Sequence, residues 1–222
     1  MARSSSPEAR PAVGSVAPAA PVIEVFADVG CPFTHVGLRR FVQRREQAGR
    51  SDVRLRVRAW PLEIVNGAPL DPDLIAEEVE DLRHTVAPDL FAGFAPERFP
   101  ATSLPAMALA AAAYQQDLDL GLVVSLELRS QLFEQGLDIS RPEVLAQVAQ
   151  QHGLTFDPED HASVLADHAE GVARAVIGSP HFFTPDGSFF CPALDISRDA
   201  DGHLRIAADP ARFEAFISTC LA

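Results

Sequence analysis

The chain has 222 residues, of which 47% are hydrophobic, and a formal net charge of −13 at pH 7. This acidic balance argues against nucleic acids and anionic membranes as partners, because both carry negative charge. All 18 basic residues are arginine, which excludes chemistry that needs a lysine, such as Schiff-base formation or a P-loop phosphate site.

Residues 1–20 are rich in Ser, Pro, Ala and Arg and contain no continuous apolar run of the signal-peptide type. We expect a disordered tail over these residues and a cytoplasmic protein. The alanine-rich stretch 106–114 is too short for a transmembrane helix, which needs about 20 apolar residues. The oligomeric state stays open.

A mostly apolar run at residues 22–27 predicts a buried β-strand. A short turn follows, and Pro32 is of the residue type favoured at the first position of a helix. This helix is expected to run to about Ala48, with apolar residues on one side and arginines on another. Cys31 therefore stands at the turn between a strand and a helix.

Residues 53–60 alternate between apolar and arginine side chains, which predicts a second strand. Arg54, Arg56 and Arg58 share one face with Trp60. A solvated or carboxylate-paired surface is the simplest interpretation of this arginine face, and an anion-binding role is the alternative.

Between residues 70 and 175 the apolar spacing is helical. Expected helices cover Asp73–His84, Leu104–Asp117 and Gly121–Gln135, and two more begin at the capping box Ser140–Glu143 and at Asp157-Pro158.

Strand signals return late in the chain. His181–Thr184 and Ser188–Cys191 flank Pro185-Asp186-Gly187, a hairpin signal, and Asp209-Pro210 begins a last helix. This order predicts an α/β sheet with an all-helical insertion. We expect the sheet domain in two parts, at residues 21–69 and 176–222, with the insertion at 70–175 between them.

The position of Cys31 has chemical consequences. A cysteine at the N-terminal end of a helix faces unpaired N–H groups and the positive end of the helix dipole, so we expect a lowered thiol pKa and nucleophilic chemistry. Thr34 is placed to donate a hydrogen bond to the thiolate, and His35 to pair with it or carry a proton. The alternatives are an inert buried cysteine and a histidine that only packs.

Three motifs, in this order, resemble the DsbA-like branch of the thioredoxin superfamily, and the resemblance covers roughly Val22 to the C-terminus. Asp28–Gly37 is similar to the active-site turn, Leu132–Ile139 to a signature of the helical insertion, and Gly178–Phe183 to the segment with the cis-proline. The branch includes DsbA oxidoreductases, FrnE-type proteins, 2-hydroxychromene-2-carboxylate isomerases and kappa-class glutathione transferases. The resemblance implies a thioredoxin-like fold with an all-helical insertion.

The active-site turn differs from that of the redox members of the branch and from that of its glutathione-dependent members. Its redox members carry Cys-x-x-Cys, whereas Thr34 stands here in place of the second cysteine. Its glutathione-dependent members carry a serine where this chain has Cys31. The resemblance further implies that Pro180 is the cis-proline and that Ser179 and Pro180 hold an extended peptide or the cysteinyl part of glutathione. A simple turn proline is the alternative.

Three further side chains are candidates around such a site. Cys191 ends the second hairpin strand and is a candidate resolving thiol, although an intervening strand is expected to hold it too far from Cys31 for a disulfide. Phe33 and Trp60 are expected to line an apolar substrate groove, with core packing as the alternative. Cys220 is expected to pack on the last helix.

No metal site is expected, because His161 and His168 among acidic residues match no familiar ligand spacing. No cofactor is expected to be bound, but a low-molecular-weight thiol such as glutathione is a candidate co-substrate.

The leading hypothesis is a monothiol thiol-disulfide oxidoreductase that acts on protein or small-molecule disulfides through Cys31. A thiol-dependent isomerase or transferase of a small organic substrate, and a non-catalytic binding module, are the alternatives.

Overall fold

The computed structural model describes residues 22–199 and 204–222, so the predicted tail at 1–20 lies outside the described residues. A four-stranded sheet has the order β2-β1-β3-β4. β1 (Val22–Ala27) runs parallel to β2 (Arg54–Ala59) and antiparallel to β3 (His181–Thr184), which forms a hairpin with β4 (Gly187–Phe190). The predicted α/β class is confirmed.

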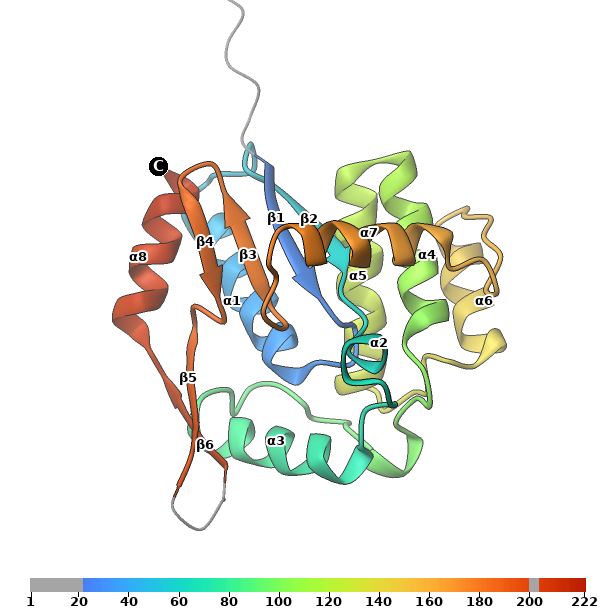
Figure 1. The fold of residues 1–222 in the computed structure, drawn as a ribbon, viewed down its shortest axis with the longest axis horizontal. Helices are drawn as coiled ribbons and strands as arrows, with labels where there is room; N and C mark the ends of the chain where they lie inside the picture. Colours follow the sequence, from blue (N-terminus) through green and yellow to red (C-terminus); the bar gives the residue numbers. More distant parts are fainter. Residues whose placement is uncertain (1–21, 200–203) are drawn as a thin grey trace, which may run out of the picture.

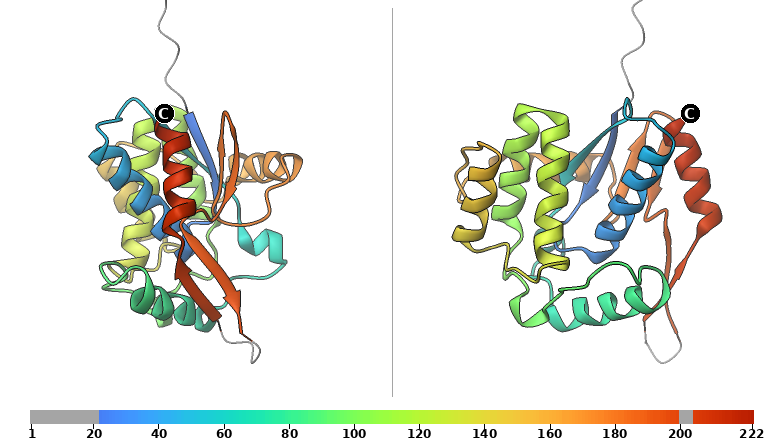
Figure 2. Two further views of the ribbon diagram at one scale, coloured as in Figure 1. Left: turned by 90° about the vertical axis from the view of Figure 1, so that its left-hand side faces the viewer. Right: turned by 180° about the vertical axis from the view of Figure 1, so that it is seen from behind.

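Helices cover both faces of this sheet (Figures 1 and 2). α1 (Pro32–Gln47) and α8 (Pro210–Leu221) pack on one face, where the rings of Phe41, Phe182 and Phe216 meet in the core. α7 (Ala162–Ala173) crosses the opposite face. Gly171 is required there, because a Cβ atom would lie 2.6 Å from the Trp60 ring.

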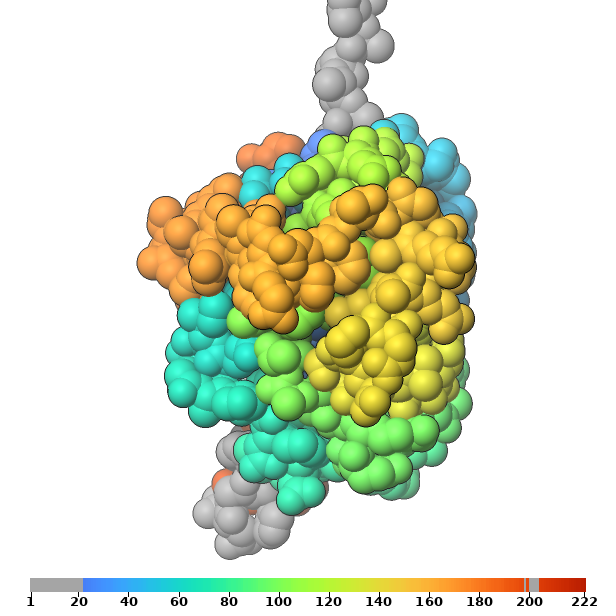
Figure 3. All heavy atoms as spheres, turned by 90° about the vertical axis from the view of Figure 1, so that its right-hand side faces the viewer, coloured from blue at the N-terminus to red at the C-terminus, as the bar shows by residue number. Residues whose placement is uncertain are grey.

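Between β2 and β3 the chain forms helices that build a second apolar core. They are α2 (Leu62–Asn66), α3 (Pro72–Thr85), the 3₁₀ helix η1 (Pro96–Arg98), α4 (Leu104–Gln116), α5 (Leu118–Phe133), α6 (Pro142–Gln151) and α7. In the space-filling view α7 (orange) lies beside α6 (yellow) and the α4–α5 segment (green) (Figure 3). None of the helices within the described residues is long and apolar enough to cross a membrane.

Two local predictions are wrong, and one pair of strands was missed. Ser140 does not cap α6, because its hydroxyl donates to Asp138 and the N-cap is Arg141. α7 begins at Ala162 and not at Asp157, because the Asp157 carboxylate and carbonyl accept hydrogen bonds within a turn. The antiparallel pair β5 (Leu194–Arg198) and β6 (Leu204–Ala208) was not predicted.

Candidate active site around Cys31

Cys31 lies where the sequence predicts it, at the junction of β1 and α1. It is the N-cap residue of α1, with extended backbone angles (φ −83°, ψ 117°), and its side chain is 3% exposed. Its Sγ donates a hydrogen bond to the carbonyl oxygen of Ser179 at 3.2 Å. The thiol is therefore buried against a segment that is 148 residues away in the sequence.

That segment brings further predicted residues to the same place. The Ser179–Pro180 peptide bond is cis. The Ser179 hydroxyl shares a 2.8 Å hydrogen bond with Thr34 Oγ1 and accepts one from the Asp28 backbone N–H at 2.9 Å. Thr34 and Ser179 thus link the first turn of α1 to the start of β3.

A cavity of about 500 Å³ opens beside this cluster and reaches Cys31 and Ser179. Phe33, Leu70, Ile75 and Ile196 contribute apolar surface, and the partly exposed Leu74 and Phe190 add to it. Glu78 on α3 is the acidic residue of the lining that acts on the Cys31 thiol. The cavity can therefore bring an apolar or extended substrate to the sulfur.

The pKa of the Cys31 thiol is raised from its ordinary value, mainly by burial, which corrects the expectation of a lowered pKa. Hydrogen bonds from Ser179 and Thr34 act in the opposite direction, and the charge of Glu78 raises the pKa further. Burial outweighs the helix terminus, so Cys31 is a neutral thiol at neutral pH in this conformation.

This pKa gives a measurable pH dependence. The rate of Cys31 alkylation by iodoacetamide should still be rising at about pH 9, because the thiolate fraction has not saturated there. Peptide mass spectrometry would follow Cys31 alone, and Cys31→Ser identifies its peptide. A rate that levels off at about pH 7 would contradict this prediction.

Asp28 is a part of the site that the sequence analysis missed. Its carboxylate is fully buried and accepts hydrogen bonds from Gly30 N–H at 2.7 Å, Leu62 N–H at 2.7 Å and the Ser103 hydroxyl at 3.2 Å. Burial raises its pKa to about 6. A carboxylate directly after a buried strand was the available signal. Asp28 fixes the turn that carries Cys31.

His35 points into the insertion. Its Nε2 lies 2.6 Å from a carboxylate oxygen of Glu134, which also accepts the backbone N–H groups of Phe91 and Ala92. The ring packs against Phe91 and Phe133, and burial lowers its pKa. Within the described residues the His35 ring makes no hydrogen bond to the Cys31 thiol, although the His35 backbone N–H donates to the Cys31 carbonyl oxygen at 3.2 Å. The catalytic role of His35 therefore stays a prediction.

Of the other two predicted residues, Trp60 lies away from the Cys31 cavity, whereas Cys191 contacts the Pro180 segment. Trp60 packs with Phe26 and Val176 under α7, away from the Cys31 cavity, so it does not form one groove with Phe33. The Cys191 N–H donates to the carbonyl oxygen of Pro180 at 2.9 Å. Burial, and secondarily the nearby Cys31, raise the pKa of Cys191 to about 12.

All three cysteines are free thiols in this structure. Cys220 lies in the core between α8 and the sheet, and burial raises its pKa to about 12. The proposed resolving role of Cys191 stays a prediction.

Comparisons with known proteins support a common fold. A family model described as a DSBA-like thioredoxin domain matches residues 22–200. A 2-hydroxychromene-2-carboxylate isomerase structure aligns with a TM-score of 0.54 at 16% identity, covering 76% of this chain and 88% of that one. No curated protein sequence matches this chain.

Two redox proteins have a similar structure. The cytosolic disulfide reductase DsbM from Pseudomonas aeruginosa with GSH has a TM-score of 0.54 at 14% identity, covering 89% of this chain and 98% of that one. A probable DsbA oxidoreductase from Streptomyces coelicolor has a TM-score of 0.54 at 16% identity, covering 76% and 82%. These similarities confirm the predicted thioredoxin-like fold with its helical insertion.

Proposed function

Because this chain belongs to the DSBA-like thioredoxin domain family, whose model matches residues 22–200, we propose that it is a thiol-disulfide oxidoreductase with Cys31 as its one active-site thiol. One observation carries the proposal. Cys31 lines a cavity of about 500 Å³ and stands at the N-terminus of α1, where its thiol contacts Ser179. Thr34 occupies the position at which a dithiol enzyme carries its second thiol.

The reaction takes two exchanges. The Cys31 sulfur attacks one sulfur of a substrate disulfide R–S–S–R′, forms Cys31–S–S–R and releases R′–S⁻, which takes up the proton that Cys31 lost. A low-molecular-weight thiol then attacks the R sulfur, releases the Cys31 thiolate for reprotonation and leaves as a disulfide with R. The net reaction consumes one low-molecular-weight thiol: R′ is released as a free thiol, and R leaves as a disulfide with the attacking thiol. When R is itself glutathione, as in a glutathionylated substrate, that product is glutathione disulfide.

The structure supplies groups for the thiolate stage. Thr34 offers both its hydroxyl and its backbone N–H to the Cys31 sulfur, and both contacts favour the thiolate. An extended substrate would lie along Ser179–Pro180. The Ser179 carbonyl oxygen, which now accepts the Cys31 S–H, would then accept a hydrogen bond from the substrate instead. Phe33 would contact its apolar part.

Glutathione or an equivalent thiol is the proposed co-substrate, and protein or small-molecule disulfides are the proposed partners. The glutathione-containing structure of the cytosolic reductase DsbM supports this choice and the predicted cytoplasmic location. The protein acts on thiols, so no bound cofactor is part of the proposal.

A steady-state assay tests this function. A glutathionylated peptide should be reduced by glutathione faster than in the uncatalysed reaction, with a rate that saturates in peptide concentration. A rate equal to that of the uncatalysed reaction, from folded protein, would reject the proposal.

The raised pKa of Cys31 favours a second candidate, a thiol-dependent isomerase or transferase. A cysteine that keeps its proton can donate an S–H hydrogen bond to the thiolate of a cofactor held at Ser179–Pro180. The structural similarity to an isomerase is consistent with this role. Saturable glutathione binding, measured by calorimetry, would survive Cys31→Ser in this case, whereas exchange chemistry would not.

Thr34→Cys should convert the site into a dithiol. Residues three apart in a helical turn lie about 5–6 Å apart, within the range that a disulfide spans. After incubation with glutathione disulfide, the mass of the variant should fall by two hydrogens, because a disulfide forms within the protein, and no stable glutathione adduct should remain. The parent chain should keep its glutathione adduct. Thr34→Ser is the matched control. A lasting adduct on the Thr34→Cys protein would contradict the prediction.

A further inference from the structure

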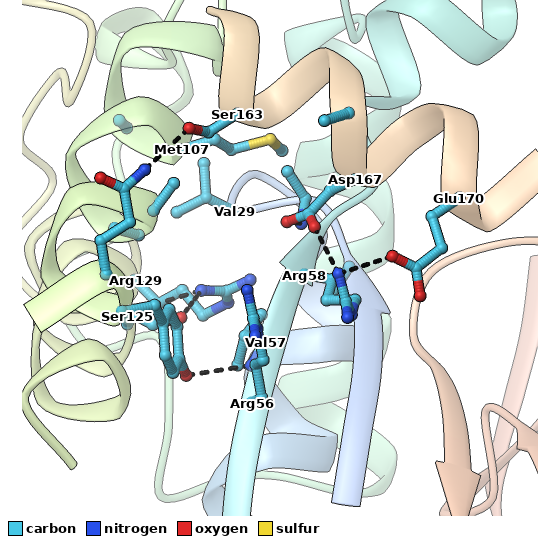
Figure 4. A pocket seen from close by; sticks show the side chains of 18 residues that line it. Val29, Arg56, Val57, Arg58, Met107, Ser125, Arg129, Ser163, Asp167 and Glu170 are labelled. Carbon is cyan, nitrogen blue, oxygen red and sulfur yellow. Dashed lines mark hydrogen bonds and ion pairs between the residues drawn. The ribbon is translucent and has the colours of Figure 1, made fainter. Parts of the chain in front are cut away.

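A second cavity lies across the Asp28–Gly30 turn from Cys31. It has a volume of about 280 Å³ and is lined by residues of β2, α4, α5 and α7 (Figure 4). Its lining shares no residue with that of the Cys31 cavity. The proposed function therefore leaves it unused.

A buried cation lines this cavity. The Arg129 side chain is 2% exposed, and its guanidinium donates only to uncharged oxygens, those of Ser125 at 2.9 and 2.7 Å and the carbonyl of Asp28 at 3.1 Å. Its Nε has no hydrogen-bond partner among the described residues. A buried charge with these contacts is incompletely compensated.

The Asp28 carboxylate lies near enough to favour the charged Arg129, but its oxygens already accept hydrogen bonds from Gly30, Leu62 and Ser103. Burial lowers the pKa of Arg129 to about 10, so the guanidinium is charged at neutral pH. The cavity is therefore positive on the side that Arg129 lines.

Arg56 adds a second positive charge on that side. Its neighbours on β2 are neutralised, Arg54 by Asp119 and Arg58 by Asp167 and Glu170. The Arg56 side chain forms no ion pair or hydrogen bond within the part of the chain that the structure describes. Figure 4 shows Arg56 and Arg129 on the same side of the cavity, with Arg58 turned toward Asp167 and Glu170.

Tyr114 provides a neutral donor at the same place. Its hydroxyl oxygen accepts the Val57 N–H at 3.0 Å, so its hydrogen is left to donate, and no acceptor for it exists among residues 22–199 and 204–222. Arg129 and Arg56 are both close enough to act electrostatically on this hydroxyl. Arg129, Arg56 and Tyr114 thus each bring a hydrogen-bond donor without an acceptor to the part of the cavity beside β2.

α7 contributes Ser163 and two carboxylates to the lining, and these carboxylates, Asp167 and Glu170, pair with Arg58. Much of the rest of the lining is apolar. Val29, Met107, Ala106, Ala110 and Ala111 line the cavity together with the β2 backbone. A cavity with a few convergent polar groups beside apolar surface suits a small molecule, and 280 Å³ corresponds to roughly nine water molecules.

We propose that this cavity binds a compact organic carboxylate, with its carboxylate at Arg56, Arg129 and Tyr114 and its apolar body against Val29 and Met107. The inference is independent of the Cys31 chemistry. Of the two interpretations of the arginine face of β2, the proposal favours anion binding, and it assigns this role to Arg56.

Benzoate is a suitable probe, followed by NMR chemical shifts of the full chain. It should shift the backbone amides of Val29 and Val57 in a saturable manner. Arg56→Gln should weaken binding by about tenfold or more, because a charge-assisted hydrogen bond is lost. Ala110→Leu should abolish binding by filling the cavity. Arg54→Gln, on the same strand but outside the lining, is the matched control and should leave the affinity unchanged.

Two further probes define the ligand class. Benzyl alcohol, which lacks the charge, and sulfate, which lacks the apolar body, should each bind at least about tenfold more weakly than benzoate. No saturable shift at roughly 10 mM benzoate would overturn the proposal. Equal benzoate affinities in the parent, Arg56→Gln and Ala110→Leu proteins would overturn it as well, as would equal binding of either other probe.

Discussion

Cys31→Ser is expected to abolish catalysed reduction of a glutathione mixed disulfide, with a loss on the order of a hundredfold or more. A hydroxyl is far less nucleophilic than a thiol and cannot form the mixed disulfide. The folded structure should be preserved, because serine is close to cysteine in size and can donate the same hydrogen bond to the Ser179 carbonyl oxygen.

The other two thiols are the matched controls for this variant. Cys191→Ser and Cys220→Ser remove buried cysteines whose pKa values burial raises to about 12. Neither should reduce the rate by more than about twofold if Cys31 works alone. Residual catalysis in Cys31→Ser would contradict the monothiol assignment. A large loss in Cys191→Ser would show instead that Cys191 takes part as the resolving thiol.

Arg129→Met is expected to lower the free energy of unfolding at pH 7 by about 3–5 kcal/mol, because it leaves the buried Asp28 carboxylate without its nearest positive charge. It also leaves the carbonyl oxygens of Ser125 and Asp28 without the donors they now have. For a protein of this size the melting temperature should fall by roughly 6–20 °C.

A surface arginine serves as the control. Arg40 forms an exposed ion pair with Asp89, and Arg40→Met should cost about 0–1 kcal/mol. An Arg129→Met protein as stable as Arg40→Met would show that Arg129 is dispensable to the turn that carries Cys31.

The pH dependence of the Arg129→Met effect gives an independent check. The folded-state pKa of Asp28 is raised to about 6 from an ordinary value of 3.8. The folded state therefore holds the Asp28 proton more tightly, and the stability this contributes is lost as the pH rises through about 6. Removing Arg129 raises this pKa further, so the deficit in unfolding free energy should be larger at pH 8 than at pH 5. An equal deficit at both pH values would contradict this account.

The elements that position Cys31 were predictable because their signals are local. The apolar run of β1, the alternation of β2 and Pro32 at the first helical position each specify one element. β5 and β6 were missed because Leu194–Arg198 and Leu204–Ala208 are strands of only five residues each, too short for their buried residues to give a distinct pattern. Asp157 was misassigned because a carboxylate before a proline serves a turn as readily as a helix start.

The properties of the site were harder to predict because they depend on distant segments. The helix terminus at Cys31 is visible in the sequence, whereas the Ser179 contact and the charge of Glu78 come from segments far along the chain. The same holds for His35, whose partner Glu134 is 99 residues away. Nothing in the local pattern distinguishes Arg56 from its paired neighbours on β2, because the acidic partners come from α5 and α7.

Mapping the glutathione adduct by peptide mass spectrometry tests the central claim most directly. Folded protein would be incubated with glutathione disulfide at several pH values, and the modified cysteine identified. We predict an adduct on Cys31 that forms faster as the pH rises, with Cys191 and Cys220 unmodified while the protein stays folded. A Cys31 that stays unmodified at every pH, or an adduct confined to Cys191 or Cys220, would contradict the assignment of Cys31 as the reactive thiol.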